Sequence, residues 1–370
     1  TIAGTVIDSS YLPDSRPIIV IYKADKIFIK QSYFKRISTV KITDAKHVEI
    51  SSCLFQNSSC VFSIVSDKSK GMVNLIRNSQ FLHCYCTKDT GAISISFWPK
   101  TQNNIISEML TQSYIYILET HFWSCYSRFG VGAINIYAQR TKVTIQINET
   151  TFYNNTSEWN GGALRTHNVN IVIIKECNFT KNQGKNGGAV RILRSTKFLS
   201  NENCFILNKA EIGGAIYGEK IELVINKNVV FKENIIRTDG AGMYCIQCAH
   251  TVAFKCLIIK NLHQIYRGSR YGTGMRFFEC YSILISECNF FNNLRPDYGG
   301  GLSVYKASIL HIRQSYFHDN SVTRQGAGAY IKIGKKLILH DNVFTNNLAS
   351  FDGGAVYCSS ITSMKNSGGI

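Results

Sequence analysis

Residues 171–190 read IVIIKECNFTKNQGKNGGAV, and the order of residue types in this stretch decides the fold because it recurs along the chain. An apolar pair two residues apart is followed by a small residue, then by Phe179 and Asn182, and Gly-Gly-Ala closes the unit. A repeat with a period between about 20 and 50 residues indicates a solenoid. Most steps here are 26 or 27 residues, and the phenylalanine position is filled by Phe34, Phe55, Phe81, Phe122, Phe152, Phe179, Phe205, Phe231, Ile258, Phe290, Phe317 and Phe344.

Each unit is expected to form short strands. The apolar alternation is the period of a strand with one buried face, and the step of three to the small residue predicts a corner. Phe179 and Cys177 alternate on the next strand, so both should point inward. The asparagine falls at a second corner, where we expect a left-handed backbone that bonds its own turn. This position recurs at Asn155, Asn182, Asn208, Asn234, Asn261, Asn293, Asn320 and Asn347.

Stacked coils can bury a core that a single coil cannot. Equivalent residues would lie about 4.8 Å apart, so the phenylalanines and the asparagines should form two structural ladders. The chain shows neither the long helical periodicity of helical repeats nor the fixed leucine spacing of leucine-rich repeats. Parallel crossovers prefer the right-handed form. The sequence therefore predicts an all-β fold, a right-handed parallel β-helix (solenoid) of about twelve coils and ~55–60 Å in length.

The combination of Gly-Gly-Ala-[Ile/Leu/Val] with Phe-x-x-Asn resembles the repeat of the chlamydial polymorphic outer-membrane proteins, which also occurs in surface proteins of parasitic protists. The tetrapeptide is present in full at residues 161–164, 187–190, 213–216 and 353–356. The resemblance covers about residues 25–360. It implies a surface-displayed β-helical protein, often an adhesin, carried by a membrane anchor.

The repeat pattern suggests one elongated domain. We expect residues 1–24 to form a cap or lead-in, residues 25–360 the β-helix, and residues 361–370 a truncated end or the start of another coil. No stretch approaches the ~18–20 apolar residues of a membrane span. We expect membrane attachment only through segments outside this chain, together with any signal or cap.

Thirteen cysteines can be compared by their place in the repeat. Four pairs fall at equal positions in neighbouring coils, close enough for a disulfide, although direct register strains such a bond. The alternative is that an inward cysteine is a small buried apolar residue. The possible disulfides are Cys60–Cys86, Cys84–Cys125, Cys248–Cys280 and Cys256–Cys288.

Five Asn-x-Ser/Thr sequons give possible glycosylation sites. Together with the cysteines they favour an oxidising compartment and hence an extracellular or cell-surface location. The sites are Asn57, Asn148, Asn154, Asn155 and Asn178.

The net charge of +17 limits the classes of partner that the chain is expected to bind. Anionic cell-surface glycans fit a basic rod, and other proteins or further copies of the chain in a filament are alternatives. The charge is also explained by outward lysines that keep a long sheet soluble. No nucleic-acid signature accompanies it, so we expect no nucleic acid partner.

The most variable spacing in the repeat indicates where a ligand would bind. Gly-Gly-Ala to the next phenylalanine takes 15 or 16 residues in the regular coils, whereas phenylalanine to Gly-Gly-Ala varies from 10 to 17. Length variation concentrates at loops that carry function. The longest such loop follows Asn261 and holds Tyr266, Arg267, Arg270 and Tyr271, which suit sugar faces and anionic groups; a merely solvated loop is the alternative.

Catalysis by a β-helix of the polysaccharide-active type needs carboxylates that converge on adjacent coils. Asp239, Asp297 and Asp352 precede the glycine corner, but their offsets differ and their coils are not adjacent. A single Cys-x-x-Cys, Cys245 to Cys248, does not recur with metal-ligand spacing. We therefore expect no catalytic residues, no metal and no cofactor. The leading hypothesis is a non-catalytic, adhesin-like surface rod; the alternatives are an architectural part of a larger assembly and a polysaccharide-active enzyme.

Overall fold

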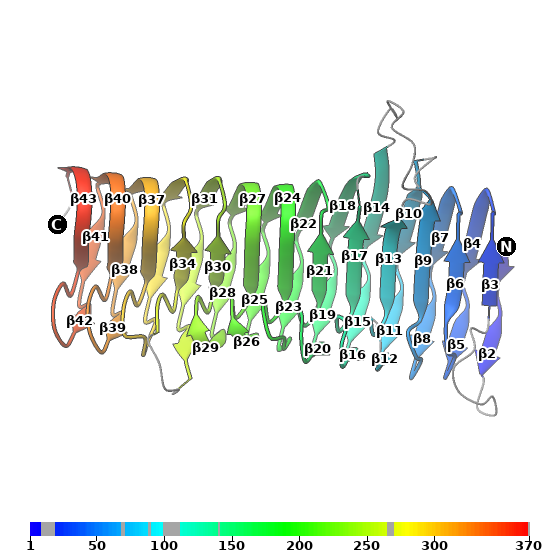
Figure 1. Cartoon of the computed structure of the whole chain (residues 1–370). Helices are drawn as coiled ribbons and strands as arrows, with labels where there is room; N and C mark the ends of the chain where they lie inside the picture. Colours follow the sequence, from blue (N-terminus) through cyan, green and yellow to red (C-terminus); the bar gives the residue numbers. More distant parts are fainter. Residues whose placement is uncertain are drawn as a thin grey trace.

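Successive coils of one solenoid make up the structure. The computed structural model describes residues 1–8, 19–67, 71–87, 90–98, 112–139, 141–264 and 270–368. Every regular element in these residues is a β-strand, and strands of successive coils lie side by side along one axis (Figure 1). Neighbouring strands run parallel, with β14 (Gln112–Leu118) beside β18 (Lys142–Asn148) as an example. The predicted parallel β-helix is confirmed.

The strands fall into three groups by their place in the coil. A 13-stranded sheet holds the phenylalanine positions, and we call it the Phe sheet. It consists of β2 (Val6–Asp8), β5 (Tyr33–Lys35), β8 (Leu54–Gln56), β11 (Gln80–Leu82), β15 (His121–Trp123), β19 (Thr151–Tyr153), β23 (Asn178–Thr180), β25 (Cys204–Ile206), β28 (Val230–Lys232), β32 (Leu257–Ile259), β36 (Asn289–Phe291), β38 (Tyr316–His318) and β41 (Val343–Thr345).

A 22-stranded sheet, the long sheet, has two strand positions in each coil. The first follows the glycine corner: β3 (Ile19–Tyr22), β6 (Val40–Thr43), β9 (Phe62–Asp67), β13 (Ile93–Trp98), β17 (Ile134–Ala138), β21 (Leu164–His167), β30 (Met243–Ile246) and β34 (Met275–Phe278). The second carries the apolar pair: β1 (Ile2–Ala3), β4 (Lys26–Lys30), β7 (His47–Ser51), β10 (Val73–Arg77), β14 (Gln112–Leu118), β18 (Lys142–Asn148), β22 (Ile171–Lys175), β31 (His250–Phe254) and β35 (Ser282–Ser286). Both positions join in β24 (Val190–Asn201), β27 (Ile216–Lys227), β37 (Leu302–Arg313), β40 (Ala329–His340) and β43 (Val356–Ser367).

Short corner strands follow the position of the ladder asparagines, which Cys84 and Cys125 occupy before β12 and β16. They are β12 (Tyr85–Cys86), β16 (Tyr126–Ser127), β20 (Thr156–Ser157), β26 (Lys209–Ile212), β29 (Ile235–Asp239), β33 (Leu262–His263), β39 (Ser321–Val322) and β42 (Leu348–Ala349).

The predicted phenylalanine ladder fills the core. Phe152 lies opposite Phe179 in the Phe sheet, and their ring centroids are 4.6 Å apart with nearly parallel planes. The same stacking continues on both sides, with Phe179 on Phe205 at 4.8 Å. These rings are fully buried. Burial of each contributes roughly 2–3 kcal/mol of transfer free energy, so the ladder is a major source of stability.

The asparagine ladder is confirmed, but its geometry differs from the prediction. Nδ2 of Asn208 donates to Oδ1 of Asn234 at 3.0 Å and to the carbonyl of Phe179 at 2.9 Å. The side chain therefore links coils instead of bonding its own turn. The left-handed residue is the one before the asparagine, such as Leu207 with φ of 57°. The prediction of a left-handed ladder asparagine was wrong because the inward side chain needs the extended conformation that continues the wall.

The predicted boundaries do not coincide with a change of structure. Within residues 1–24, β1 pairs with β4 and β2 pairs with β5, which places Ile7 opposite Phe34. Isoleucine in the phenylalanine position hid this strand from the sequence pattern. At the other boundary, β43 runs through residue 360 to Ser367 in register with β40.

Candidate ligand-binding edge

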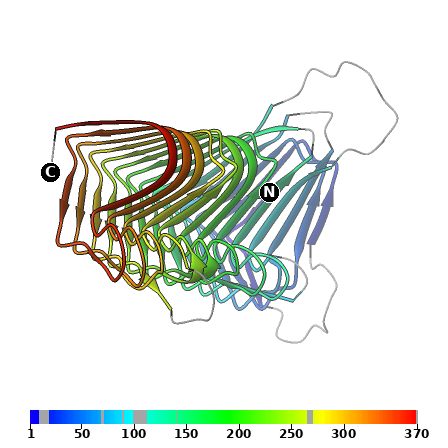
Figure 2. The same cartoon turned by 60° about the vertical axis from the view of Figure 1, so that its left-hand side comes forward.

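The loops between the ladder asparagine and the glycine corner lie along one side of the rod, which we call the variable edge. In the central coils it comprises residues 126–132, 156–162, 183–188 and 209–214. Its corner strands pair in register, so Tyr126 lies opposite Thr156. Figure 2 shows these corners following one another along the length of the rod.

The glycine corner fixes where each of these loops must end. A Cβ added to Gly162 would lie 2.2 Å from the carbonyl oxygen of Gly188, far closer than atoms can approach. Gly187 has φ of +76°, which other residues rarely adopt. Because the corner cannot move outward, extra residues can only enlarge the loop before it.

Exposed aromatic residues and cations occupy the central part of this edge. Phe129 and Trp159 each stand seven residues after a ladder phenylalanine, and they are 53% and 52% exposed. The ammonium of Lys185 lies 5.0 Å from the ring centroid of Trp159, and the guanidinium of Arg128 lies 5.1 Å from that of Phe129. A row of aromatic faces with adjacent cations suits sugar rings and anionic groups.

A shallow hollow of about 260 Å³ opens beside this row. Its lining includes three cationic side chains, Lys185, Lys209 and Arg237, together with Glu158 and Glu211. Lys185 thus belongs both to the hollow and to the aromatic row.

On the other side of the row, two arginines of the long sheet face outward in neighbouring coils. Arg165 of β21 lies opposite Arg191 of β24. Burial and the neighbouring charge of Arg191 lower the pKa of Arg165, and burial lowers the pKa of Arg191. Nη1 of Arg191 donates to Oδ1 of Asn160 at 2.6 Å, which ties this arginine to the loop that holds Trp159.

Neither arginine has a full set of partners. The Nε atoms of Arg165 and Arg191 are buried without an acceptor. Oδ1 of Asn135, which lies opposite Arg165 on the other side, is buried without a donor. Among the described residues, no carboxylate is in ion-pair contact with either guanidinium. Glu219 acts on Arg191 through space, but its carboxylate accepts a hydrogen bond from Tyr217 at 3.0 Å.

These arginines were missed in the sequence, although a signal was present. Each stands two residues after the alanine of a full Gly-Gly-Ala, in consecutive repeats. In an alternating strand that position faces away from the core, so equal register predicts adjacent cations.

The predicted ligand-binding loop is described only in part. Tyr266 and Arg267 lie outside the described residues. Arg270 is engaged within the protein, because its guanidinium meets the carboxylate of Asp297 at 3.0 Å. Burial acts to raise the pKa of Asp297, but hydrogen bonds from Arg270 and Thr323 outweigh it and lower that pKa.

Tyr271 is likewise packed against neighbouring groups. Its ring stacks on Tyr298 with centroids 4.9 Å apart, and the guanidinium of Arg276 lies 4.2 Å from its centroid. The assignment of Tyr266, Arg267, Arg270 and Tyr271 to ligand binding stays a prediction.

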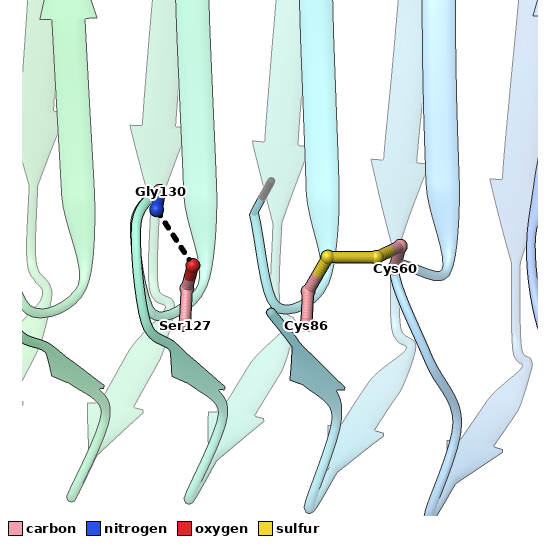
Figure 3. Close-up of a disulfide and its surroundings, with 4 residues drawn as sticks. All are labelled: Cys60, Cys86, Ser127 and Gly130. Carbon is pink, nitrogen blue, oxygen red and sulfur yellow. Dashed lines mark hydrogen bonds between the residues drawn. A yellow bond between two sulfur atoms is a disulfide. The ribbon is translucent and has the colours of Figure 1, made fainter. Parts of the chain in front are cut away.

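One of the four predicted disulfides is formed. Cys60 and Cys86 are bonded across neighbouring coils, and the next coil carries Ser127 at the same position, where it accepts a hydrogen bond from the Gly130 amide at 2.8 Å (Figure 3).

The other three predicted disulfides were wrong, because those cysteines are free thiols whose sulfurs approach backbone carbonyls of the preceding coil. The contacts are Cys84 to Phe55, Cys125 to Phe81, Cys248 to Gly218, Cys280 to Cys245, Cys256 to Asn226 and Cys288 to Ala253.

The five possible glycosylation sites differ in how far their asparagine side chains are exposed. Asn155 is fully buried, and its Nδ2 donates to the Phe122 carbonyl and to Asn182, so its assignment as a glycan site was wrong. Asn57, Asn154 and Asn178 are exposed and Asn148 is half-buried. Glycosylation at these four stays a prediction.

Two of the three aspartates before the glycine corner contact backbone in other coils, and Asp352 accepts a hydrogen bond from the side chain of Gln325 at 2.9 Å. Asp239 accepts a hydrogen bond from the amide of Tyr271 at 3.0 Å, and Asp297 accepts one from the amide of Arg270 at 3.1 Å. The two carboxylates therefore hold the same segment from opposite sides. The described ranges contain no cluster of three or more histidine, cysteine or acidic side chains placed to hold a metal. Nor do they contain a helix long and apolar enough to cross a bilayer.

Two family models match parts of the chain. Residues 149–167 match the Chlamydia polymorphic membrane protein (Chlamydia_PMP) repeat, and residues 262–367 match the right handed beta helix region. No curated protein and no solved structure matches the chain. The first match contains Phe152, Asn155 and the glycine corner at 161–162, the residues that build the ladders and end the variable loop. Residues 149–167 are therefore similar to a Chlamydia polymorphic membrane protein repeat, and the repeats of this chain build a right-handed parallel β-helix.

Proposed function

We propose that this protein is a non-catalytic component of a cell surface that presents a rigid rod and binds ligands, in the manner of an adhesin, along its variable edge. The observation that carries the proposal is the gathering of exposed aromatic and cationic side chains, Phe129, Trp159 and Lys185, on the edge where loop length varies. The repeat match supports a surface location, because the matched family is described as membrane proteins.

A continuous core supports the role as a rod. The coils contact one another through the phenylalanine ladder, in which Ile258 takes one position, and the asparagine ladder adds hydrogen bonds from Asn155 to Asn347. A solenoid built in this way transmits its shape from coil to coil, so a binding edge keeps its spacing over the whole length.

The arrangement of carboxylates supports a non-catalytic role. Hydrolysis or elimination on a polysaccharide needs acidic groups that are free to act on the substrate. Asp297 is held by Arg270 and Thr323, and Asp239 is held by the amide of Tyr271.

Two measurements test the proposal. Antibody labelling of intact cells of the source organism should detect the protein without permeabilisation. Purified protein should bind fixed cells or an array of acidic and neutral glycans, and prolonged incubation with the bound glycans should release no new reducing ends. Labelling only after permeabilisation, or turnover of a bound glycan, would contradict the proposal.

A further inference from the structure

We propose that Arg165 and Arg191 form an anion-binding site for the sulfate or carboxylate groups of an acidic polysaccharide, whose sugar rings lie along Trp159 and Phe129. The inference rests on the proposed function; it names the ligand class and adds two arginines of the long sheet that lie beside the variable edge.

The arginine pair is energetically costly in the free protein. Two guanidinium groups in adjacent registered coils have backbones about 4.8 Å apart. Like charges held so close and half-buried destabilise the fold unless a countercharge is present. Among the described side chains none supplies an ion pair to Arg165 or Arg191, and both Nε atoms lack acceptors.

A third arginine in the same row, Arg276, allows a comparison. It lies over the ring of Tyr271, Asp239 acts on it electrostatically, and its Nη1 donates to Oγ of Ser303, although its Nε lacks an acceptor. Arg191 has partners of the same kinds, because it lies over the ring of Tyr217, Glu219 acts on it electrostatically and its Nη1 donates to Asn160. Among the described residues, Arg165 is the arginine of this row that has no hydrogen bond and no ion pair.

The side chains around the arginine pair suit an acidic saccharide. Asn160 joins the arginines to the aromatic row, because its Oδ1 accepts from Arg191 and its Nδ2 donates to the Phe129 carbonyl at 3.3 Å. Trp159 precedes it with half its surface exposed. Guanidinium forks bind sulfate and carboxylate groups in two-point contacts, while aromatic faces stack on sugar rings, so the two together favour an acidic saccharide.

The coils follow one another along the rod as sugar units follow one another along a linear polysaccharide. Cationic groups continue past the arginines into the hollow lined by Lys185, Lys209 and Arg237. A chain that lies along the rod axis would meet a cation or an aromatic ring in each of several successive coils. A single small anion would use only the arginine pair.

The test is the affinity of the intact protein for a fluorescent heparin octasaccharide, measured by anisotropy at two salt concentrations. The Arg165→Gln/Arg191→Gln variant should bind about 10-fold more weakly or worse, since each charge-assisted hydrogen bond is worth a large factor. The matched control is Lys197→Gln/Lys227→Gln, two exposed positions of the long sheet with the same loss of charge. It should change the affinity by no more than about 2-fold, because exposed charges act only through screened long-range attraction.

Equal weakening by both variants would show that net charge alone attracts the octasaccharide and would overturn the inference. So would unchanged affinity in the arginine variant. Tight binding of a single-stranded oligonucleotide with the same dependence on Arg165 and Arg191 would also overturn it, in favour of a general polyanion site.

The unfolding temperature of the arginine variant distinguishes a role of Arg165 and Arg191 in binding from a role in folding. Without ligand, the arginine variant should unfold at the same temperature as the parent or a higher one, because repulsion is removed. A lower unfolding temperature together with unchanged affinity would assign both arginines to the fold. If the parent protein binds cells but the arginines make no difference, this inference fails and the proposed function stands. If the arginines bind the octasaccharide but the protein is absent from the cell surface, the proposed function fails and this inference stands.

Discussion

The side-chain amide of Asn182 donates to Oδ1 of Asn208 at 3.0 Å, and both side chains are fully buried. Asn208 repeats this contact toward Asn234, and it also accepts a hydrogen bond from the backbone amide of Asn182. Asn208 therefore links its own coil to the coil before it and the coil after it. The ladder asparagines are buried and hydrogen-bonded to one another, so their side chains are not available to a ligand.

Asn208→Ala should destabilise the protein by about 3 kcal/mol, because it leaves several buried donors and acceptors without partners. Urea unfolding followed by circular dichroism measures the change. The matched variant is Asn347→Ala in the last described asparagine coil, where the side chain is only half-buried and the loss should be about 1 kcal/mol. Equal losses at the two positions would contradict a role that depends on burial.

Gly188→Ala should prevent stable folding or cost more than about 4 kcal/mol, because the new Cβ would lie 2.1 Å from the carbonyl oxygen of Gly214. Gly334→Ala is the control. Its Cβ would meet the end of the Ile361 side chain at 3.0 Å, which can shift, so the change should stay within about 1 kcal/mol. Urea unfolding of both variants checks the difference. Tolerance of alanine at residue 188 would show that the corner is looser than described.

The single disulfide predicts a specific labelling pattern. Alkylation of the denatured, unreduced protein should modify 11 cysteines and spare Cys60 and Cys86. Cys60→Ser/Cys86→Ser should lower the unfolding free energy by about 3 kcal/mol, as expected for a loop of this length. Cys84→Ser/Cys125→Ser is the control and should cost less, because serine can donate to the same carbonyls. A peptide linked through Cys84 and Cys125 in mass spectra would contradict the structure.

Buried thiols predict a loss of stability at alkaline pH. Burial raises the pKa of Cys177 from 9.0 to about 12. Above about pH 9 the unfolded chain loses this proton while the folded chain keeps it, so the unfolding free energy falls as pH rises toward 12. The slope is about 1.4 kcal/mol per pH unit for one thiol. Urea unfolding of the parent and Cys177→Ser at pH 8, 9 and 10 should show that the unfolding free energy declines less in the variant. Equal declines would show that the Cys177 thiol does not cause the loss of stability.

The ladders could be predicted from the sequence because each depends on one residue type at one position of the repeat. Phe179 and Asn182 recur at fixed spacing, and stacking brings each next to its own kind. The same logic located the disulfide between Cys60 and Cys86. It failed for Cys84 and Cys125, since equal register also allows each thiol to contact a carbonyl, and spacing alone does not distinguish the two arrangements.

The binding edge could be predicted only as a side of the rod. Spacing showed where loop length varies, but loop length drew attention to Arg270, whose guanidinium is paired with Asp297. Arg165 and Arg191 lie on regular strands, where no length variation marks them. Their significance depends on the lack of nearby countercharge, which is a property of the folded coils.

The central claim is that recognition lies on the variable edge and the arginines beside it, and not on the Phe sheet, and two tryptophans test it most directly. Trp159 on the variable edge and Trp123 on the outer face of the Phe sheet are 52% and 50% exposed, so alanine removes a similar exposed ring at each site. The measurement is adherence of protein-coated beads to a cell monolayer, with both variants confirmed as folded. Trp159→Ala should reduce adherence at least about 5-fold, as loss of an aromatic anchor does, and Trp123→Ala should leave it nearly unchanged. Equal losses, or a larger loss for Trp123→Ala, would contradict the account.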